Sequence, residues 1–186
     1  MRSLWLLALS LALLALPTGA HAQPPWGGER PFIDLDEDGT TDFTLKSTSM
    51  VGNEDVTSFE VMIRPKDENR VVARKGTETE IGEKERFVAA FERGALIGKA
   101  LPDTLEWASD VPPEIYDFVS NLAVPWQGPW PSETPQYLGL KLVKDGNTYY
   151  GWAHLRLDRK YQWAVSIREK AYNSRSGPSV QAGHMQ

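Results

Sequence analysis

The last third of the chain carries the pattern that most restricts the fold, because apolar and polar residues alternate there with a period of two. Leu138, Leu140 and Leu142 alternate up to a turn at 144–147, whose Asp145-Gly146 pair is typical of a tight hairpin loop. The alternation resumes after the turn at Tyr149, Gly151, Ala153, Leu155 and Leu157, and again at Tyr161, Trp163, Val165 and Ile167. The pattern predicts a β-hairpin followed by a third strand.

Shorter segments upstream also have the composition of strands, and they lie at 31–33, 43–50, 59–64 and 69–74. Short strands separated by Gly- and Pro-containing turns are typical of two-sheet β architectures. The sequence therefore predicts a mainly β fold, an antiparallel β-sandwich or jelly-roll-like single domain with one or two short helices.

The best helix prediction is 110–122, where Asp110 can cap the N-terminus and two prolines suit the first turn. Its apolar stripe consists of Ile115, Phe118, Val119 and Leu122. Residues 83–91 fit either a helix or a buried strand, and periodicity does not decide between them. We expect a rigid irregular loop at 126–135 and a short tail after Gly177.

The N-terminus has the three parts of a secretory signal peptide. Arg2 supplies a positive charge, residues 4–16 are apolar apart from Ser10, and Ala20-His21-Ala22 supplies a small-x-small cleavage site. An uncleaved anchor is the alternative, but the apolar run is shorter than the roughly 20 residues that cross a bilayer. We expect residues 1–22 to be removed and 23–186 to form a single secreted or periplasmic domain with no transmembrane segment.

The charge and the cysteine content limit the classes of partner. The chain has 20 Lys and Arg, 25 Asp and Glu, and a net charge of −5, and loss of Arg2 leaves 19 basic side chains against 25 acidic ones. An acidic surface repels a phosphate backbone, so nucleic acid is not an expected partner. Cys is absent, so no disulfide supports the fold, which fits an exported bacterial protein.

Residues 34–42 form an acidic loop, Asp-Leu-Asp-Glu-Asp-Gly-Thr-Thr-Asp, that matches the start of a calcium-binding motif. Ca²⁺ takes roughly six to eight oxygen ligands, and alternate residues of a curling loop direct their side chains to one centre. Gly39 permits the sharp turn that such a loop needs. The predicted calcium ligands are the carboxylates of Asp34, Asp36, Asp38 and Asp42 and the carbonyl of Thr40.

The acidic loop departs from the helix–loop–helix motif at its twelfth position, where Leu45 replaces the bidentate glutamate. Because its flanks have the composition of strands, it looks like the calcium loops that join two strands in integrin-type propellers, in a single copy. A solvated acidic turn is the alternative, since Asp and Gly are common turn residues. Four aspartates within nine residues repel one another without a cation, which favours the ion.

The acidic loop and the C-terminal hairpin together resemble those of a family of uncharacterised secreted bacterial proteins. The segments that carry the resemblance are Asp34 to Phe43, Tyr137-Leu138-Gly139-Leu140, Tyr150 to Leu155, and Ala171-Tyr172 through Gly177, Val180 and Ala182-Gly183. The resemblance implies a secreted β domain with a calcium-type loop and implies no reaction.

The sequence names no catalytic residue. It has no Gly-x-Ser-x-Gly, and the histidines left after signal cleavage are His154 and His184. A lone His on a strand is far more often packed or exposed than a general base. A carboxylate-based glycoside hydrolase stays an alternative, but nothing selects a pair of acids. We expect a binding or structural role.

Carbohydrate binding is the other alternative. Exposed aromatic rings could stack on the sugars of an extracellular glycan or another cell-surface component, and the candidate stacking residues are Trp126, Trp130, Tyr150 and Trp152. Packing of these rings in the core is the favoured interpretation, because aromatic residues dominate core energetics.

Overall fold

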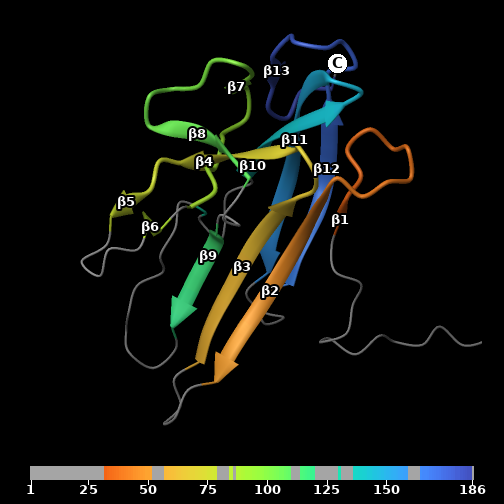
Figure 1. The fold of residues 1–186 in the computed structure, drawn as a ribbon. Coiled ribbons are helices and arrows are strands. Elements are labelled where there is room, and N and C mark those ends of the chain that lie inside the picture. The colour runs from red at the N-terminus through yellow and green to blue at the C-terminus, as the bar shows by residue number, and fades with distance from the viewer. Residues whose placement is uncertain are drawn as a thin grey trace, which may run out of the picture.

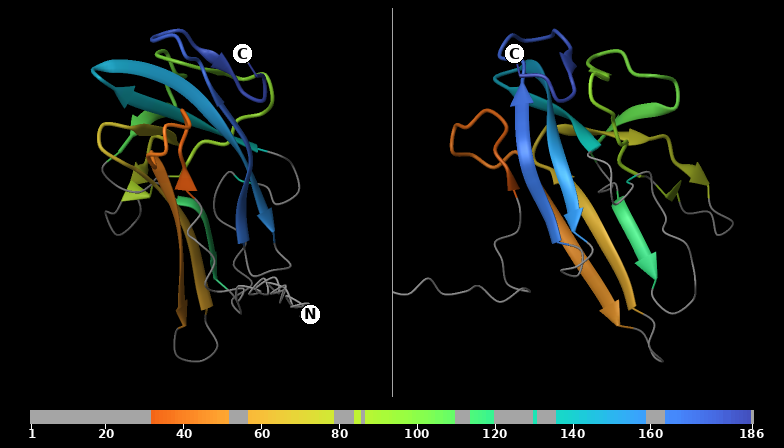
Figure 2. Two further views of the ribbon diagram at one scale, coloured as in Figure 1. Left: turned by 90° about the vertical axis from the view of Figure 1, so that its right-hand side faces the viewer. Right: turned by 180° about the vertical axis from the view of Figure 1, so that it is seen from behind.

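The computed structural model describes residues 32–51, 57–78, 84–85, 87–109, 114–119, 130, 136–158 and 164–185. The signal peptide predicted at 1–22 lies outside these residues. The described chain is mainly β, as predicted, and its strands form two main antiparallel sheets (Figures 1 and 2).

The four-stranded sheet has the order β1-β2-β3-β9. It is made of β1 (Phe32–Ile33), β2 (Phe43–Val51), β3 (Thr57–Pro65) and β9 (Glu114–Val119). The five-stranded sheet has the order β12-β11-β10-β4-β8. It is made of β12 (Ala164–Tyr172), β11 (Asn147–Asp158), β10 (Gln136–Lys144), β4 (Arg70–Arg74) and β8 (Leu105–Ala108).

Two further ribbons have two strands each. β13 (Val180–Gln181) pairs with β7 (Leu96–Ile97), and β5 (Thr77–Glu78) pairs with β6 (Lys84–Glu85). The β7–β13 ribbon lies at the top of Figure 1, beside the C-terminus.

The predicted hairpin is confirmed as β10 and β11. Lys144 pairs with Asn147, and Asp145 and Gly146 between them have φ angles of 51° and 73°. Positive φ at both central residues is the geometry of a type I′ turn, whose twist matches that of the flanking strands. The Asp-Gly pair therefore sets the register in which the apolar faces of both strands coincide.

The main core lies between the two large sheets, which makes the architecture sandwich-like. Alternate residues of each strand point into it, so that Phe43 and Leu45 of β2 face Leu138 and Leu140 of β10 within one buried cluster. In Figure 1, β2 and β3 pass in front of β11 and β12, and the side view in Figure 2 separates the layers. This core follows from the period of two in the sequence, because alternate side chains of a strand lie on the same face of the sheet.

A second core covers the opposite face of the five-stranded sheet. Val72, Tyr137, Tyr150 and Trp152 of the sheet pack there against residues 89–97 and 180–182. Gly139 permits this contact, since a Cβ on it would lie 2.7 Å from Val72 Cγ2 and 3.0 Å from Phe91 Cε2. The sheet is consequently covered on both faces.

The helix predicted at 110–122 is wrong, because residues 114–119 form β9 and pair antiparallel with β3. β-Branched and aromatic residues are frequent in this segment, and hydrogen bonding to the open edge of β3 outweighs the helical spacing of its apolar residues. No helix occurs in the part of the chain that the structure describes. The described part of 83–91 is extended, with bridges from Val88 to Ala73 and from Phe91 to Tyr137, as in the strand alternative.

The C-terminal segment is not the short tail that the sequence predicts. Val180 is 1 % exposed, Ala182 is fully buried, and the Ala182 amide donates to the Ala95 carbonyl at 2.9 Å. The Trp152 indole N–H donates to the His184 carbonyl at 3.2 Å. The segment closes the second core, because its two apolar side chains cover the hairpin aromatics.

Candidate metal centre

The acidic loop, residues 34–42, connects β1 to β2 and is fastened to the sandwich by Leu35. This side chain is 2 % exposed and belongs to the main core. A Cβ on Gly151 of β11 would lie 2.9 Å from Leu35 Cδ2, so the glycine leaves the space that Leu35 fills. One apolar residue within an acidic run thereby fixes where the aspartates on either side of it lie.

Backbone hydrogen bonds close the acidic loop around Asp34. Its Oδ1 accepts from the Asp38 amide at 3.2 Å and its Oδ2 from the Gly39 amide at 2.8 Å. Glu37 and Gly39 have φ angles of 62° and 88°, in the left-handed region that a sharp turn requires. The prediction that Gly39 makes the turn is confirmed.

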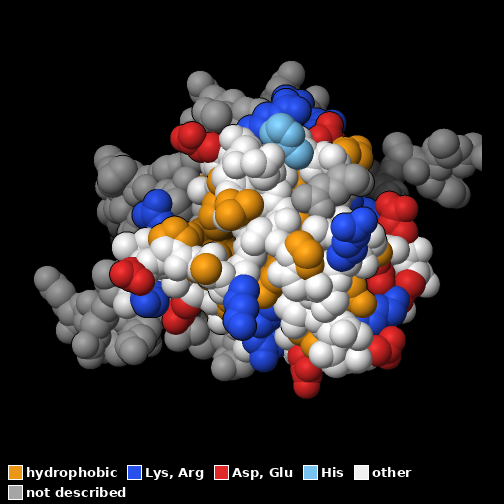
Figure 3. All heavy atoms as spheres, turned by 90° about the horizontal axis from the view of Figure 1, so that it is seen from above, with side chains coloured by type: hydrophobic (Ala, Val, Ile, Leu, Met, Phe, Trp, Pro, Cys, Tyr) orange, Lys and Arg blue, Asp and Glu red, His pale blue; other side chains and the backbone are white. Residues whose placement is uncertain are grey.

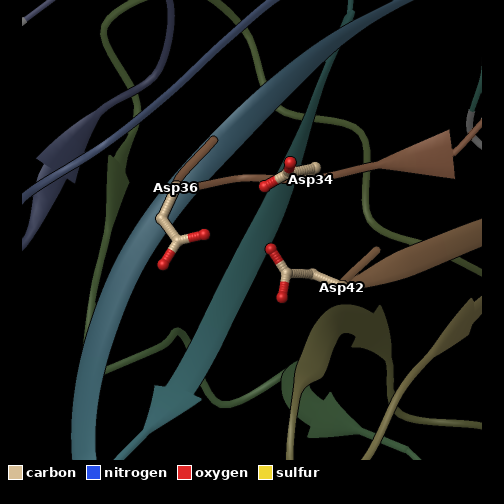
Figure 4. A group of neighbouring side chains, drawn as sticks. All are labelled: Asp34, Asp36 and Asp42. Carbon is tan, nitrogen blue, oxygen red and sulfur yellow. The ribbon is translucent and has the colours of Figure 1, made fainter. Parts of the chain in front are cut away.

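Asp34, Asp36 and Asp42 direct their carboxylates toward one another (Figure 4), and one oxygen from each lies within 4.8 Å of the others. Two oxygens bound to one Ca²⁺ at about 2.3–2.6 Å each can lie up to roughly 5 Å apart. The spacing of the three carboxylates therefore fits a shared cation.

Asp36 supplies the feature that an ordinary acidic turn does not explain. Its side chain is only 8 % exposed, and its Oδ1 is buried with no hydrogen-bond partner. An unpartnered buried carboxylate oxygen is costly, because nothing replaces the water that it has lost. A cation between the three carboxylates would satisfy this oxygen.

Asp42, the residue before β2, is 7 % exposed, and its Oδ2 accepts from the Leu35 amide at 2.7 Å. Burial raises the pKa of this carboxyl above its usual value, and the Leu35 amide partly offsets the rise. The negative charges of the neighbouring aspartates raise the same pKa further. The centre thus concentrates negative charge at a place where water is scarce.

One of the predicted carboxylate ligands, Asp38, lies outside the three-carboxylate group. Asp38 turns outward, where its Oδ1 accepts from the Thr40 amide at 2.7 Å and its Oδ2 from Lys144 Nζ at 2.6 Å. Thr40 itself is exposed. The hydrogen bonds from Lys144 and Thr40 lower the pKa of Asp38 to about 2. The structure therefore brings together three of the four predicted carboxylates.

Two lysines from the five-stranded sheet meet the acidic loop, and the sequence did not identify either of them. Lys144 Nζ lies 2.6 Å from both Asp36 Oδ2 and Asp38 Oδ2. Lys170 Nζ of β12 donates to the Asp34 carbonyl and lies 3.2 Å from Glu37 Oε1. Seen from above, the side of the molecule that carries the loop shows acidic side chains with Lys or Arg side chains among them (Figure 3).

Asn69 joins the acidic loop to the second sheet and was also missed. This side chain is 4 % exposed; its amide nitrogen donates to the Asp42 carbonyl at 3.3 Å, and its oxygen accepts from the Val143 amide at 2.8 Å. Asn69 therefore links the last residue of the acidic loop to β10 beside the centre. A buried position for an asparagine between strands gives no local sequence signal, because Asn is equally common in turns.

The candidate stacking residues pack inside the protein where the structure describes them. Trp130 lies in the main core and donates to the Val88 carbonyl at 3.0 Å, while Tyr150 and Trp152 lie in the second core. Trp152 meets Tyr137 edge to face, with ring centroids 5.3 Å apart. Their exposed fractions are 5 % or less, so core packing, the favoured interpretation, holds for these three. Trp126 lies outside the described residues.

Within the described ranges, no helix has the length and apolar character needed to cross a bilayer. His154 lies beside Tyr137 on the outer face of the hairpin, with ring centroids 5.0 Å apart. Among the described residues, Asp34, Asp36 and Asp42 form the group of acidic side chains that could hold a metal ion.

Comparison with known proteins finds no relative of this chain. No family model, no curated protein and no solved structure matches the chain. The assignment of the centre accordingly rests on the geometry and the chemistry of its own residues.

Proposed function

We propose that this chain is an exported β-sandwich protein that binds Ca²⁺ in the acidic loop, with a binding or structural role. Asp34, Asp36 and Asp42 would supply the carboxylate ligands. The observation that carries the proposal is the buried, unpartnered Oδ1 of Asp36 beside the two other carboxylates. The predicted signal peptide and the resemblance to secreted bacterial β domains support export.

The donor set favours calcium over other divalent ions. The group offers hard carboxylate oxygens, whereas Zn²⁺ prefers sites with Cys or His ligands. Mg²⁺ requires near-octahedral geometry and gives up its waters reluctantly. Backbone carbonyls such as that of Thr40, and water, would complete the coordination of Ca²⁺.

The role of the ion would be to stabilise the end of the sandwich where β1 and β2 meet β11. Only the folded loop gathers the three carboxylates, so calcium at 100 times its dissociation constant adds about 2.7 kcal/mol to the free energy of unfolding. We expect a dissociation constant on the order of 10⁻⁴–10⁻³ M, the range of extracellular modules, because the bidentate glutamate is absent.

Calorimetric titration and thermal unfolding of residues 23–186 test the proposal. We expect a heat of Ca²⁺ binding and a higher Tm with Ca²⁺ than with Mg²⁺ or a chelator. Asp36→Asn removes the charge with little change in shape and is expected to abolish most of the calcium response. The matched control is Asp103→Asn, since Asp103 is an exposed aspartate in a turn away from the loop. Equal Tm values with calcium, magnesium and chelator, together with no binding heat, would make the loop an ordinary acidic turn.

A further inference from the structure

We propose that Lys144 is an internal cation of the same centre, which holds the acidic loop when no metal ion is bound and competes with the ion for Asp36. This inference rests on the proposed calcium site and concerns its regulation. It couples occupancy of the site to the turn of the β10–β11 hairpin, of which Lys144 is the last strand residue before Asp145.

The contacts of Lys144 are those of a bridging cation. Its Nζ lies 2.6 Å from one oxygen of Asp36 and 2.6 Å from one oxygen of Asp38, residues more than 100 positions away in the chain. Charge-assisted hydrogen bonds of this length are strong, and two on one ammonium draw the aspartates together as an ion would. The loop therefore keeps its folded shape with part of its charge neutralised from within the protein.

The two oxygens of the Asp36 carboxylate have different surroundings. Its Oδ2 is taken by Lys144, while its Oδ1 is buried and unpartnered beside Asp34 and Asp42. An ion bound to Oδ1 and the ammonium held by Oδ2 would lie on one carboxylate, a few ångströms apart, and repel each other. Binding of the ion thus weakens the contact with Lys144, and Lys144 lowers the affinity for the ion.

Lys144 is free to leave the site, whereas Lys170 is not arranged as a competitor. The Lys144 side chain is 42 % exposed, so solvent can receive the ammonium when it is displaced. Lys170 is 25 % exposed and donates to the backbone carbonyl of Asp34, so it anchors the loop without occupying a carboxylate of the three-aspartate group. The two lysines have different roles: one neutralises a ligand and the other holds the loop to β12.

The test compares calcium affinities of the folded wild-type protein, Lys144→Met and Lys144→Gln by calorimetric titration, with the Tm of each metal-free form. Met keeps most of the apolar stem, and Gln keeps a hydrogen-bond donor without the charge, so the two variants separate charge from shape. Lys99→Met is the control, because Lys99 is exposed and its loss changes the net charge equally. Far-UV circular dichroism checks that each variant is folded.

We expect both Lys144 variants to bind Ca²⁺ about tenfold more tightly than the wild type, the factor for a unit charge and a divalent ion roughly 6 Å apart in a water-like dielectric. Their metal-free forms are expected to melt at lower temperature, while Lys99→Met matches the wild type. Unchanged or weaker binding in both variants, with normal binding by the wild type, would overturn the inference and leave the calcium site intact. No binding by any of the proteins would refute the site itself.

Discussion

Replacement of Gly151 by Ala tests whether the acidic loop is held in place by packing on β11. An added Cβ would lie 2.7 Å from the Ala171 carbonyl oxygen, 2.9 Å from Tyr172 Cβ and 2.9 Å from Leu35 Cδ2. Leu35 can change rotamer, but the other two atoms belong to the framework of β12 and move only with that strand. The methyl group therefore pushes β12 and the loop away from β11.

The cost of Gly151→Ala follows from two opposing effects. Overpacking a tight interior typically costs about 1–3 kcal/mol. The lower entropy of the unfolded chain returns about 0.4–1 kcal/mol on replacing Gly by Ala. Taking the midpoints of the two ranges, about 2 and about 0.7 kcal/mol, the net loss in the free energy of unfolding is about 1.3 kcal/mol, which lowers the Tm by roughly 3–5 °C for a domain of this size. Calcium affinity is expected to fall as well, because Leu35 lies between Asp34 and Asp36.

Thermal and urea unfolding in chelator measure the stability, and a double-mutant cycle with Leu35→Ala isolates the contact. Leu35→Ala alone empties a buried site and is expected to cost about 2–5 kcal/mol. Since it also removes one of the three atoms that the new methyl would meet, the double variant is expected to be more stable than the sum of the single losses predicts. A Gly151→Ala protein with an unchanged Tm and full calcium affinity would refute the packing of the loop on β11.

Three further outcomes are expected. Asn69→Leu leaves the Val143 amide without its acceptor and removes one of the two hydrogen bonds to the Asp42 carbonyl, which still accepts from the Lys66 amide. The free energy of unfolding is expected to fall by about 1–3 kcal/mol, and an unchanged urea midpoint would contradict this bridge. Trp152→Ala costs about 3–5 kcal/mol, because the ring is 1 % exposed, whereas His154→Ala, at a half-buried position, costs less in the same urea titration; equal losses would contradict the second core. Intact-mass analysis of exported protein is expected to show a chain that begins at Gln23, and retention of residues 1–22 there would refute the signal peptide.

Local patterns in the sequence determined strands β1 to β4, strands β10 to β12 and the loop between β1 and β2, but neither β8 nor β9. A period of two places every second side chain on the same face wherever the strand lies, so the apolar faces of β10 and β11 follow without knowledge of their partners. The Asp-Gly pair at 145–146 sets the hairpin turn by its tolerance of positive φ. The spacing of Asp34, Asp36 and Asp42 brings three carboxylates together because loop closure is itself local.

The failed helix at 110–122 shows the limit of such patterns. Apolar residues three and four apart fit a helix, but β9 pairs with β3, which precedes it by about 50 residues. The gain from completing that sheet depends on where the edge of β3 lies in space, and local spacing carries no information about it.

Only the tertiary structure decided which groups surround the acidic loop. Lys144, Lys170 and Asn69 have ordinary surroundings in the sequence, and each reaches the loop through the pairing of strands far apart in the chain. The same folding buries Asp36 and leaves its Oδ1 without a partner, while Asp38, two residues later, turns outward to Lys144. Sequence spacing supplies candidate ligands, but burial and opposing charge choose among them, and both depend on long-range contacts that form only when the two sheets pack.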